Sequence, residues 1–209
     1  MKEFDERSAS VDELWEYCLE EYKNKNPLIQ ILLDNFFKKI EKIVSFLGNN
    51  LKILEVGCGA GESSRRIAAM LNTQHFEVSE FDERYVKKLK EINFPFRITQ
   101  ESVYALKRDG NEFDCVLLLE VLEHLDNVHL ALMELFRVSR KYVVISIPND
   151  PLWRILNMMR FKYLKYFGNT PGHINHWSKR GFKRLISKYG KVLEIYTPVP
   201  WIVVLAEKK

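Results

Sequence analysis

Two short stretches carry the side chains that could move a proton. The stretch "EVLEH" contains Glu120, Glu123 and His124, and the stretch "PGHINHWS" contains His173 and His176. Imidazole and carboxylate groups act as general bases toward hydroxyl nucleophiles, and the same groups hold hard divalent cations. These residue types therefore predict either acid–base catalysis or a metal site.

We expect acid–base chemistry, and we expect no divalent metal. The candidate catalytic residues are His124, His173 and His176. A cation held by Glu120, Glu123 and His124 is the alternative for the first stretch. The purely structural alternatives are a packed or capping imidazole at the first stretch and a polar loop that orders the following helix at the second.

A glycine-rich stretch, "ILEVGCGAGESSRRIA", lies between an apolar run and a helical run. Its glycines, Gly57, Gly59 and Gly61, have the spacing G-x-G-x-G. The dinucleotide fingerprint needs a glycine where Glu62 stands, and the Lys and Ser/Thr of a phosphate-binding loop are missing. Glu55, two residues before the glycines, suits a ligand with an ammonium group. We therefore expect the loop to cradle an amino-acid-bearing nucleoside.

A second acid strengthens this prediction. Glu80 ends an expected strand, 25 positions after Glu55 (80 − 55). An acid at that place can bind both hydroxyls of a ribose. The alternative is a surface acid or a helix N-cap, but the neighbouring Asp82 is the better cap for the helix that follows.

The elements that must position these residues are short apolar runs that alternate with helical segments. Continuous apolar strands separated by helices form a parallel sheet covered on both faces. We therefore expect a doubly wound α/β fold, which binds ligands at the carboxyl ends of its strands. The expected strands are 52–56, 75–79, 96–99, 113–119 and 142–147, and the expected helices between them are 62–71, 82–92 and 127–139.

The C-terminal region has a different pattern. A helix over 178–190 is expected to stop at Gly190, and the strands 191–197 and 201–207 follow it. Only "PVP" separates these two strands, which is too short for a crossover helix, so they must be antiparallel to each other. The sequence thus predicts a mainly parallel sheet that ends in an antiparallel hairpin.

The N-terminal region is expected to be helical over residues 10–47, with a capping box formed by Ser10 and Glu13 and a break at Pro27. Three aromatic residues of this region, Trp15, Tyr17 and Tyr22, are candidates to close one side of a pocket. The alternative is an apolar stripe that packs in the core.

The composition is that of an ordinary globular protein with 209 residues, 46% hydrophobic and 29% charged. We expect one domain over residues 1–209. No apolar run has the roughly 20 residues of a membrane span, and the charged N-terminus is not typical of a secretory signal. Three widely spaced cysteines indicate neither a disulfide framework nor a zinc site. A reducing, cytoplasmic setting is expected.

The net charge of +4 is unevenly distributed. Residues 1–26 carry eight acids and four bases, whereas residues 151–193 carry ten Lys or Arg and no acid. Such a block can face an acidic substrate, a membrane surface or nucleic acid. The alternative is a solvated helix face.

The motifs resemble those of the class I S-adenosylmethionine-dependent methyltransferases. "ILEVGCGAG" resembles their first motif, "EFDERYVKKLKE" their second-strand motif and "FDCVLLLEVLEHL" their fourth strand and its exit. The resemblance covers about residues 50–150 well and implies a seven-stranded sheet, S-adenosylmethionine as cofactor and S-adenosylhomocysteine as product.

By this resemblance, each part of the cofactor has candidate binding residues. The family usually meets the adenine with an acid after the third strand, where this chain has "TQESVYAL". The implied residues are Glu55, Gly57, Cys58, Gly59, Gly61 and Glu120 for the methionine part, Glu80 and Phe81 for the ribose, and Glu101, Ser102 and Val103 for the adenine.

The resemblance also bears on the acceptor. Ubiquinone-type O-methyltransferases and small-RNA terminal 2′-O-methyltransferases share the E-x-x-E-H pattern as a metal site, and "HINH" loosely matches the later histidine segment of the second group. We expect transfer to a small-molecule acceptor at oxygen, anionic or lipid-like in character. An RNA methyltransferase and a non-catalytic S-adenosylmethionine-binding protein are the alternatives.

Two appendages complete the prediction. Residues 1–47 are expected to form a helical cap, and residues 150–177 a lid-like insertion over the acceptor site. The alternatives for the insertion are a packed helix and an interfacial helix in peripheral contact with membrane lipid. The sequence does not indicate an oligomeric state.

Overall fold

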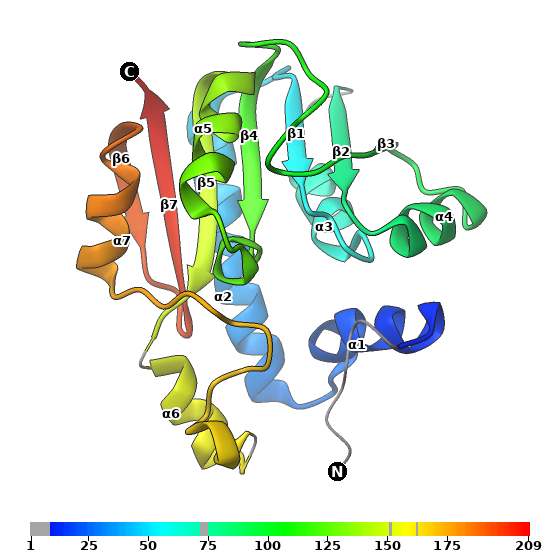
Figure 1. Ribbon diagram of the computed structural model, residues 1–209, viewed down its shortest axis with the longest axis vertical. Helices are drawn as coiled ribbons and strands as arrows, with labels where there is room; N and C mark the ends of the chain where they lie inside the picture. Colours follow the sequence, from blue (N-terminus) through cyan, green and yellow to red (C-terminus); the bar gives the residue numbers. More distant parts are fainter. Residues whose placement is uncertain (1–8, 72–74, 151, 162) are drawn as a thin grey trace.

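A seven-stranded sheet forms the centre of the computed structural model (Figure 1). The structure describes residues 9–71, 75–150, 152–161 and 163–209. Parts of the expected cap (residues 1–8) and lid (residues 151 and 162) therefore lie outside the described residues. The strands are β1 (Ile53–Val56), β2 (Phe76–Glu80), β3 (Arg97–Gln100), β4 (Phe113–Leu119), β5 (Ser139–Pro148), β6 (Gly190–Tyr196) and β7 (Trp201–Lys208).

The strand order is β3-β2-β1-β4-β5-β7-β6. The first five strands along the chain pair in parallel, and β7 is antiparallel to both β5 and β6. This arrangement confirms the expected doubly wound, mostly parallel sheet with an antiparallel C-terminal hairpin. The order reverses between β1 and β4, so the carboxyl ends of these two strands flank the point where such sheets bind ligands.

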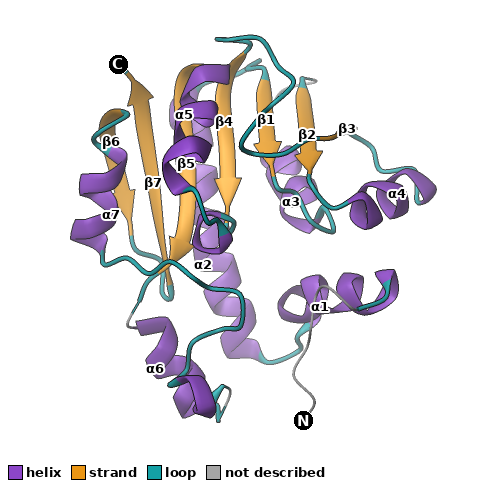
Figure 2. Ribbon diagram, in the orientation of Figure 1, coloured by secondary structure: helices purple, strands orange, loops and turns teal. Residues whose placement is uncertain are grey.

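Helices cover both faces of the sheet (Figure 2). Apolar residues of α5 and α7 pack on one face, and those of α2, α3 and α4 pack on the other. The central strands β1, β4 and β7 are buried on both faces, as the continuous apolar runs in the sequence predicted, whereas β3 and β6 at the two edges are partly exposed. The helices are α1 (Val11–Lys23), α2 (Pro27–Leu47), α3 (Glu62–Met70), α4 (Glu83–Glu91), α5 (Val128–Val138), α6 (Leu152–Met159) and α7 (Lys179–Ile186).

The predicted helix starts are confirmed in detail. The Ser10 amide donates to Glu13 Oε2 over 2.8 Å, and the Glu13 amide donates to Ser10 Oγ over 3.3 Å. These reciprocal bonds are the expected capping box at the N-terminus of α1. Pro27 begins α2, and the Asp82 side chain caps α4 by accepting from the Arg84 amide. No helix among the described residues is both long and apolar enough to cross a bilayer.

One helix ends earlier than expected. The helix expected over 178–190 ends at Ile186, and Gly190 begins β6 instead of stopping the helix.

The region expected as a lid-like insertion begins with α6. This helix ends at Met159, and the backbone then turns to positive φ at Phe161 (55°) and Tyr163 (54°). A short 3₁₀ turn, Leu164–Tyr166, follows. The described part of this region therefore contains a two-turn helix and a compact loop.

Candidate cofactor and acceptor site

The glycine loop between β1 and α3 is held against the end of β2. The amides of Gly57 and Cys58 donate to the Ser79 carbonyl over 2.8 and 3.1 Å. Gly57 has a φ of 75°, and a Cβ there would lie 2.7 Å from Cγ2 of Val121. A residue with a side chain would therefore be strained at this position. The result is an open backbone cradle at the carboxyl edge of the sheet.

Glu80 lies beside this cradle, at the last position of β2. Its carboxylate accepts hydrogen bonds from the amides of Gly59 (2.8 Å), Phe81 (2.7 Å) and Asp82 (3.0 Å). Burial nevertheless raises the pKa of Glu80 above its ordinary value, against the effect of these amides. Three backbone donors fix the orientation of the carboxylate, so it forms a rigid acceptor at the mouth of the glycine loop.

Glu55 lies beneath the loop and is fully buried. The Ser63 hydroxyl donates to its Oε1 over 2.7 Å, whereas Oε2 has no hydrogen-bond partner among the described residues. Burial raises the pKa of Glu55 to about 7. A carboxylate in this state is poised to accept one further donor or a nearby positive charge.

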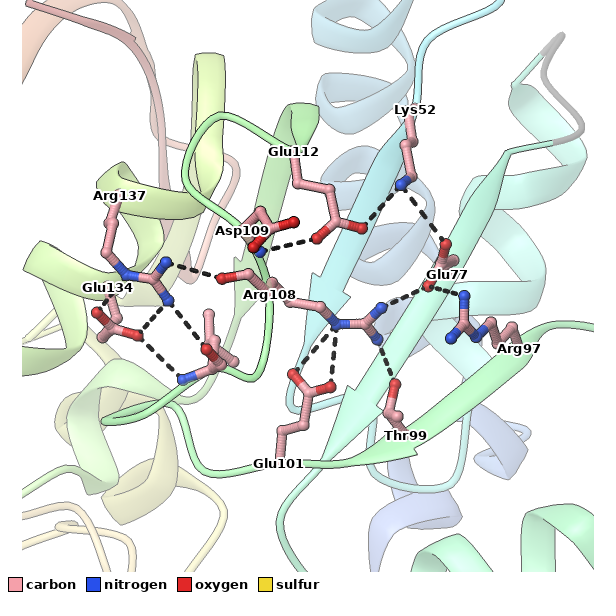
Figure 3. Close-up of polar contacts among 11 residues, drawn as sticks. Lys52, Glu77, Arg97, Thr99, Glu101, Arg108, Asp109, Glu112, Glu134 and Arg137 are labelled. Carbon is pink, nitrogen blue, oxygen red and sulfur yellow. Dashed lines mark hydrogen bonds and ion pairs between the residues drawn. The ribbon is translucent and has the colours of Figure 1, made fainter.

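The loop between β3 and β4 is anchored by two arginines (Figure 3). The Arg108 guanidinium lies 2.9 Å from Oε1 of Glu101 and 2.8 Å from Oε2 of Glu77, and it also donates to Thr99. Arg108 and Glu101 are almost completely buried. The Glu101 carboxylate is therefore held by a cation of its own chain, and we did not anticipate this pairing from the sequence.

The second anchor is Arg137 on α5. Its guanidinium donates to the carbonyls of Arg108 (2.8 Å) and Leu106 (2.9 Å) and pairs with Glu134, which also accepts from the Leu106 amide (Figure 3). These contacts fix the far end of the loop. Its near end, with Ser102 and Val103, lines the cavity described next.

A cavity of about 690 Å³ opens at the carboxyl edge of the sheet. It is walled by the glycine loop, the start of the β3–β4 loop, the exit of β4, the N-terminal helices and the segment after β5. Of the expected site residues it is lined by Gly57, Cys58, Gly59, Glu80, Phe81, Glu101, Ser102, Val103, Glu120, His124 and His173. Glu55, Gly61 and His176 are not among the described residues that line it.

Two histidines meet on one wall of this cavity. The rings of His124 and His173 are perpendicular, with centroids 4.8 Å apart. Nδ1 of His124 lies 3.1 Å from the Gly172 carbonyl. A carbonyl can only accept, so Nδ1 carries the proton and Nε2 is left with a lone pair in the neutral ring.

His173 is kept neutral by its surroundings. Burial, together with His124 and His176, lowers the pKa of His173 to about 3. Its ring also stacks on Trp153, with centroids 6.3 Å apart. His173 can therefore donate or accept a hydrogen bond across the whole physiological range without becoming charged.

The third candidate histidine lies elsewhere. His176 pairs with Asp150 at the end of β5. The amides of Ile174 and Asn175 donate to the Glu123 carbonyl over 3.0 and 3.1 Å, which fixes the course of the loop between the two histidines. The structure thus brings His124 and His173 together and places His176 in a separate ion pair.

A buried carboxyl lies next to the histidine pair. Burial raises the pKa of Glu123 well above its ordinary value, and the nearby Glu120 adds to the shift. Glu123 Oε2 has no hydrogen-bond partner among the described residues. Glu123, His124 and His173 offer ligand atoms within 4.8 Å of one another, a set that differs from the expected alternative by containing His173 in place of Glu120.

Several residues of the cavity could not be found from sequence motifs. Tyr17, Cys18 and Tyr22 enter from α1, in line with one of the two interpretations of that region. Trp15 is not among the described residues that line the cavity, and its ring lies 6.2 Å from that of Tyr85. Phe36 enters from α2 and Trp201 from β7. The segment after β5 adds Trp153, Asn157, Arg160, Tyr163 and Thr170. The only sequence signal of this last group is the concentration of aromatic and basic residues after β5.

The polar groups of the cavity fit an amino-acid-bearing nucleoside. Glu80 offers a fixed carboxylate for a diol, and the glycine loop leaves room for a ligand at its backbone. Glu55 is a buried acid with an unpartnered oxygen next to Ser63, which lines the cavity. No Lys or Arg lies in the glycine loop itself, in contrast to a triphosphate site.

Comparisons with known proteins agree with this chemistry. A family model described as a methyltransferase domain matches residues 25–194. A ubiquinone biosynthesis O-methyltransferase of Rickettsia canadensis is 35% identical over 151 residues, which cover 67% of this chain and 61% of that protein. Its counterpart in Rickettsia bellii is 29% identical, with 67% and 60% covered. The chain thus spans about 60% of the length of these relatives.

Solved structures show the same fold at low sequence identity. The magnesium protoporphyrin IX methyltransferase of Synechocystis with bound S-adenosylhomocysteine superposes with a TM-score of 0.65 and 12% identity, covering 95% of this chain and 98% of that one. An S-adenosylmethionine-dependent methyltransferase of Thermotoga maritima gives 0.63 and 18%, covering 94% and 99%. The family match and the fold together show that the chain belongs to the methyltransferase-domain family and is a class I S-adenosylmethionine-dependent methyltransferase.

Proposed function

We propose that the chain methylates a hydroxyl oxygen of a small-molecule acceptor, with His124 as the general base. The observation that carries the proposal is the His124–Gly172 contact of 3.1 Å, which assigns the ring proton to Nδ1 and the lone pair to Nε2. His124 lines the cavity, and its Nε2 lies 4.0 Å from Oε1 of Glu123. A neutral hydroxyl needs a base of this kind, whereas a thiolate or a neutral amine is already nucleophilic. The names of the Rickettsia relatives, which are O-methyltransferases, support the same acceptor atom.

The proposed cofactor contacts follow the placement of the polar groups. The glycine loop, with Cys58 and Gly61, and the buried Glu55 would hold the methionine part, and Glu80 with Phe81 would hold the ribose. Glu120 would face the methionine end, where the Ser146 hydroxyl donates to its Oε1 over 2.7 Å. Ser102 and the Val103 backbone would meet the adenine. Glu101 would contribute its backbone, because its carboxylate pairs with Arg108.

The chemistry assigned to the protein is alignment and proton removal. S-adenosylmethionine, when bound, supplies an electrophilic methyl group on a sulfonium. The acceptor oxygen forms the new bond to carbon as the bond from carbon to sulfur breaks, and His124 Nε2 takes the hydroxyl proton. Holding the acceptor oxygen close to the methyl group and in line with it lowers much of the barrier to such a displacement.

The acceptor side of the cavity favours an apolar body with an anionic group. Trp153, Trp201 and Phe36 contribute aromatic walls, and Arg160 contributes a cationic side chain. Asn157 donates to the Gly168 carbonyl over 3.0 Å and ties α6 to the loop that carries His173. We propose residues 150–177 as the acceptor lid on this basis.

The test is methyl transfer from labelled S-adenosylmethionine to matched sets of phenols, aromatic amines and thiols, each with and without a carboxylate. The proposal expects ethers as products, with the carboxylated phenols ahead of the uncharged ones, and loss of turnover in His124→Gln. Transfer to amine or thiol acceptors alone, or to RNA alone, would refute the proposed acceptor class. Binding of S-adenosylhomocysteine without transfer to any acceptor would favour a non-catalytic role.

The cluster of Glu123, His124 and His173 supplies a second candidate mechanism for the same reaction. Two imidazoles and a carboxylate suit a divalent cation, and their ligand atoms lie within 4.8 Å of one another. Turnover that is abolished by a chelator and restored by Mg²⁺ or Mn²⁺ would assign these residues to a metal. Turnover that is unchanged by chelation would assign His124 to proton transfer.

A further inference from the structure

We propose that the segment after β5, residues 152–161 and 163–174, binds the surface of an anionic lipid bilayer. Three features of the segment support this role: an exposed apolar surface, a strained backbone and a positive charge. The proposal goes beyond the proposed function and does not depend on it, because membrane binding can be measured without methyl transfer.

The segment exposes large apolar side chains. Phe161 is 83% exposed, Phe167 77% and Met159 71%. The other large apolar residues exposed in this segment are Ile155, Met158, Leu164, Tyr166 and Ile174. Scattered apolar residues are normal on a protein surface, but a gathering of this size in one short segment marks an interaction site.

Two of these residues, Phe161 and Phe167, adopt an unfavourable backbone conformation although their side chains contribute little to the packing of the fold. Phe161 and Phe167 have φ values of 55° and 50°. Bulky residues are rare in this left-handed region, where Gly or Asn is favoured. The Phe161 amide donates to the Met158 carbonyl over 3.0 Å and the Phe167 amide to the Leu164 carbonyl over 3.1 Å, which stabilises the two turns. The largely exposed rings add little packing to them. Such strain at a fixed position indicates a functional demand for the aromatic ring.

The charge of the segment selects the partner. Residues 151–193 contain no acid, and Arg160 and Lys165 are exposed among the aromatic residues. Aromatic rings and methionine beside Lys and Arg are the composition of surfaces that enter the headgroup region of an anionic bilayer. Single-stranded RNA can also stack its bases on exposed phenylalanines, but it would not explain the exposed Met159 and Leu164.

The geometry links this surface to the cavity. α6 lies beyond the carboxyl ends of the parallel strands (Figure 1). Trp153, Asn157 and Arg160 follow one another at helical spacing and line the cavity, whereas Ile155 and Met159 are exposed. The same segment therefore lines the proposed acceptor site and exposes apolar side chains to solvent. If these side chains enter the bilayer, an acceptor dissolved in the membrane can reach the cavity directly from the lipid surface.

The test is co-sedimentation of the full chain with vesicles of phosphatidylcholine alone or mixed with phosphatidylglycerol. We expect binding to the mixed vesicles that weakens with added salt. The double variant Phe161→Asn/Phe167→Asn should weaken binding about tenfold or more, as the loss of two inserted rings predicts. Asn tolerates the left-handed region, so this variant should remain folded.

Phe46→Asn is the matched control, because Phe46 is also exposed (65%) but lies at the end of α2. Its vesicle binding should equal that of the unmodified chain. Met159→Gln should weaken binding without any change at a left-handed position, and Lys165→Ser should reduce the preference for anionic vesicles. Retained S-adenosylhomocysteine binding shows that each variant is folded.

Three results would overturn the proposal. They are no binding of the unmodified chain to anionic vesicles, equal binding by the Phe161/Phe167 double variant, and equal loss in the Phe46 control. Displacement from vesicles by single-stranded RNA with no effect of the apolar substitutions would assign the surface to RNA instead. Loss of methyl transfer to every small acceptor with intact vesicle binding would refute only the proposed function.

Discussion

Arg108 holds Glu101 across the turn that begins the β3–β4 loop, with the guanidinium Nε 2.9 Å from Oε1 of the carboxylate. Both side chains are almost completely buried, and Arg108 reaches Glu77 on β2 at the same time. One wall of the cofactor cavity is therefore fixed by an ion pair whose members are seven residues apart in sequence. The pair joins the loop to the edge of the sheet.

Replacing Arg108 should destabilise the protein and weaken cofactor binding. Arg108→Met leaves the buried Glu101 carboxylate without its cation, whereas Glu77 keeps Arg97 and Lys52 nearby. The unpaired Glu101 charge costs about 3 kcal/mol of unfolding free energy. Arg108→Lys keeps the charge but loses the forked contact, so its loss should be smaller. Urea denaturation and calorimetry with S-adenosylhomocysteine measure the two effects.

Arg97→Met is the matched control for Arg108. Arg97 approaches the same Glu77 carboxylate at 3.6 Å, but its side chain is 70% exposed. Its substitution should change stability by less than about 1 kcal/mol. Equal effects of the two substitutions would show that the buried pair does not hold the loop.

His124 is predicted to act on turnover rather than on cofactor binding. His124→Gln should lower kcat by about 10²-fold or more, the usual contribution of a general base, and should leave the affinity for S-adenosylhomocysteine unchanged. His129→Gln is the control, because His129 lies on α5 and contacts Tyr189 outside the described cavity lining. Steady-state kinetics of both variants would decide the role, and an unchanged kcat in His124→Gln would remove the residue from the mechanism.

His176→Gln separates the two neighbouring histidines. The ring of His176 pairs with Asp150 and is not among the described residues that line the cavity, so its loss should reduce stability more than kcat. A fall in kcat equal to that of His124→Gln, at unchanged stability, would restore His176 as a catalytic candidate.

Glu55 should make stability depend on pH in a defined window. Burial raises its pKa from 4.5 to about 7 in the folded protein. The folded state then keeps a proton that the unfolded chain has already lost. The unfolding free energy therefore falls by about 3 kcal/mol for this residue as pH rises from about 4.5 to about 7. Above about pH 7 the contribution of Glu55 no longer changes.

The variant Glu55→Gln isolates this effect. Other carboxyls, including Glu80 and Glu123, also have raised pKa values. The pH dependence of the unfolding free energy must therefore be compared between Glu55→Gln and the unmodified chain. Urea denaturation at about pH 5 and about pH 8 should show a smaller fall for Glu55→Gln than for the unmodified chain. Glu83→Gln, at an exposed ion pair with Lys87, should keep the full fall. Identical slopes in all three proteins would contradict the shift at Glu55.

The fold was predictable because its signals are local. The central strands are continuous apolar runs, and several helices have a start signal such as Ser10 or Asp82 next to them. The short "PVP" connection fixed the antiparallel hairpin through chain length alone. Glu80 and the glycine loop could be placed together because both follow parallel strands, whose carboxyl ends share one edge of the sheet.

The remainder of the site depends on long-range pairing that periodicity does not reveal. The Glu101 carboxylate is engaged because Arg108 turns back toward Glu77 and Thr99, which come from two different strands. His173 and His176 are equivalent by spacing, but the bonds of the intervening loop to Glu123 separate them. The positive φ of Phe161, which ends α6 early, contradicts the preference of its own residue type.

Gly57 is predicted to be irreplaceable for two separable reasons. An alanine would adopt an unfavourable φ of 75°, and its Cβ would lie 2.7 Å from Val121 Cγ2. Gly57→Ala should therefore lose about 1–3 kcal/mol of stability and weaken S-adenosylhomocysteine binding. The double variant Gly57→Ala/Val121→Ala removes the collision but not the backbone strain, so it should regain only part of the cofactor affinity.

Gly110→Ala is the control, because a Cβ there meets its nearest neighbour, the Arg137 carbonyl, at an ordinary 3.6 Å. Unchanged binding in Gly57→Ala would show that the cofactor does not approach this backbone.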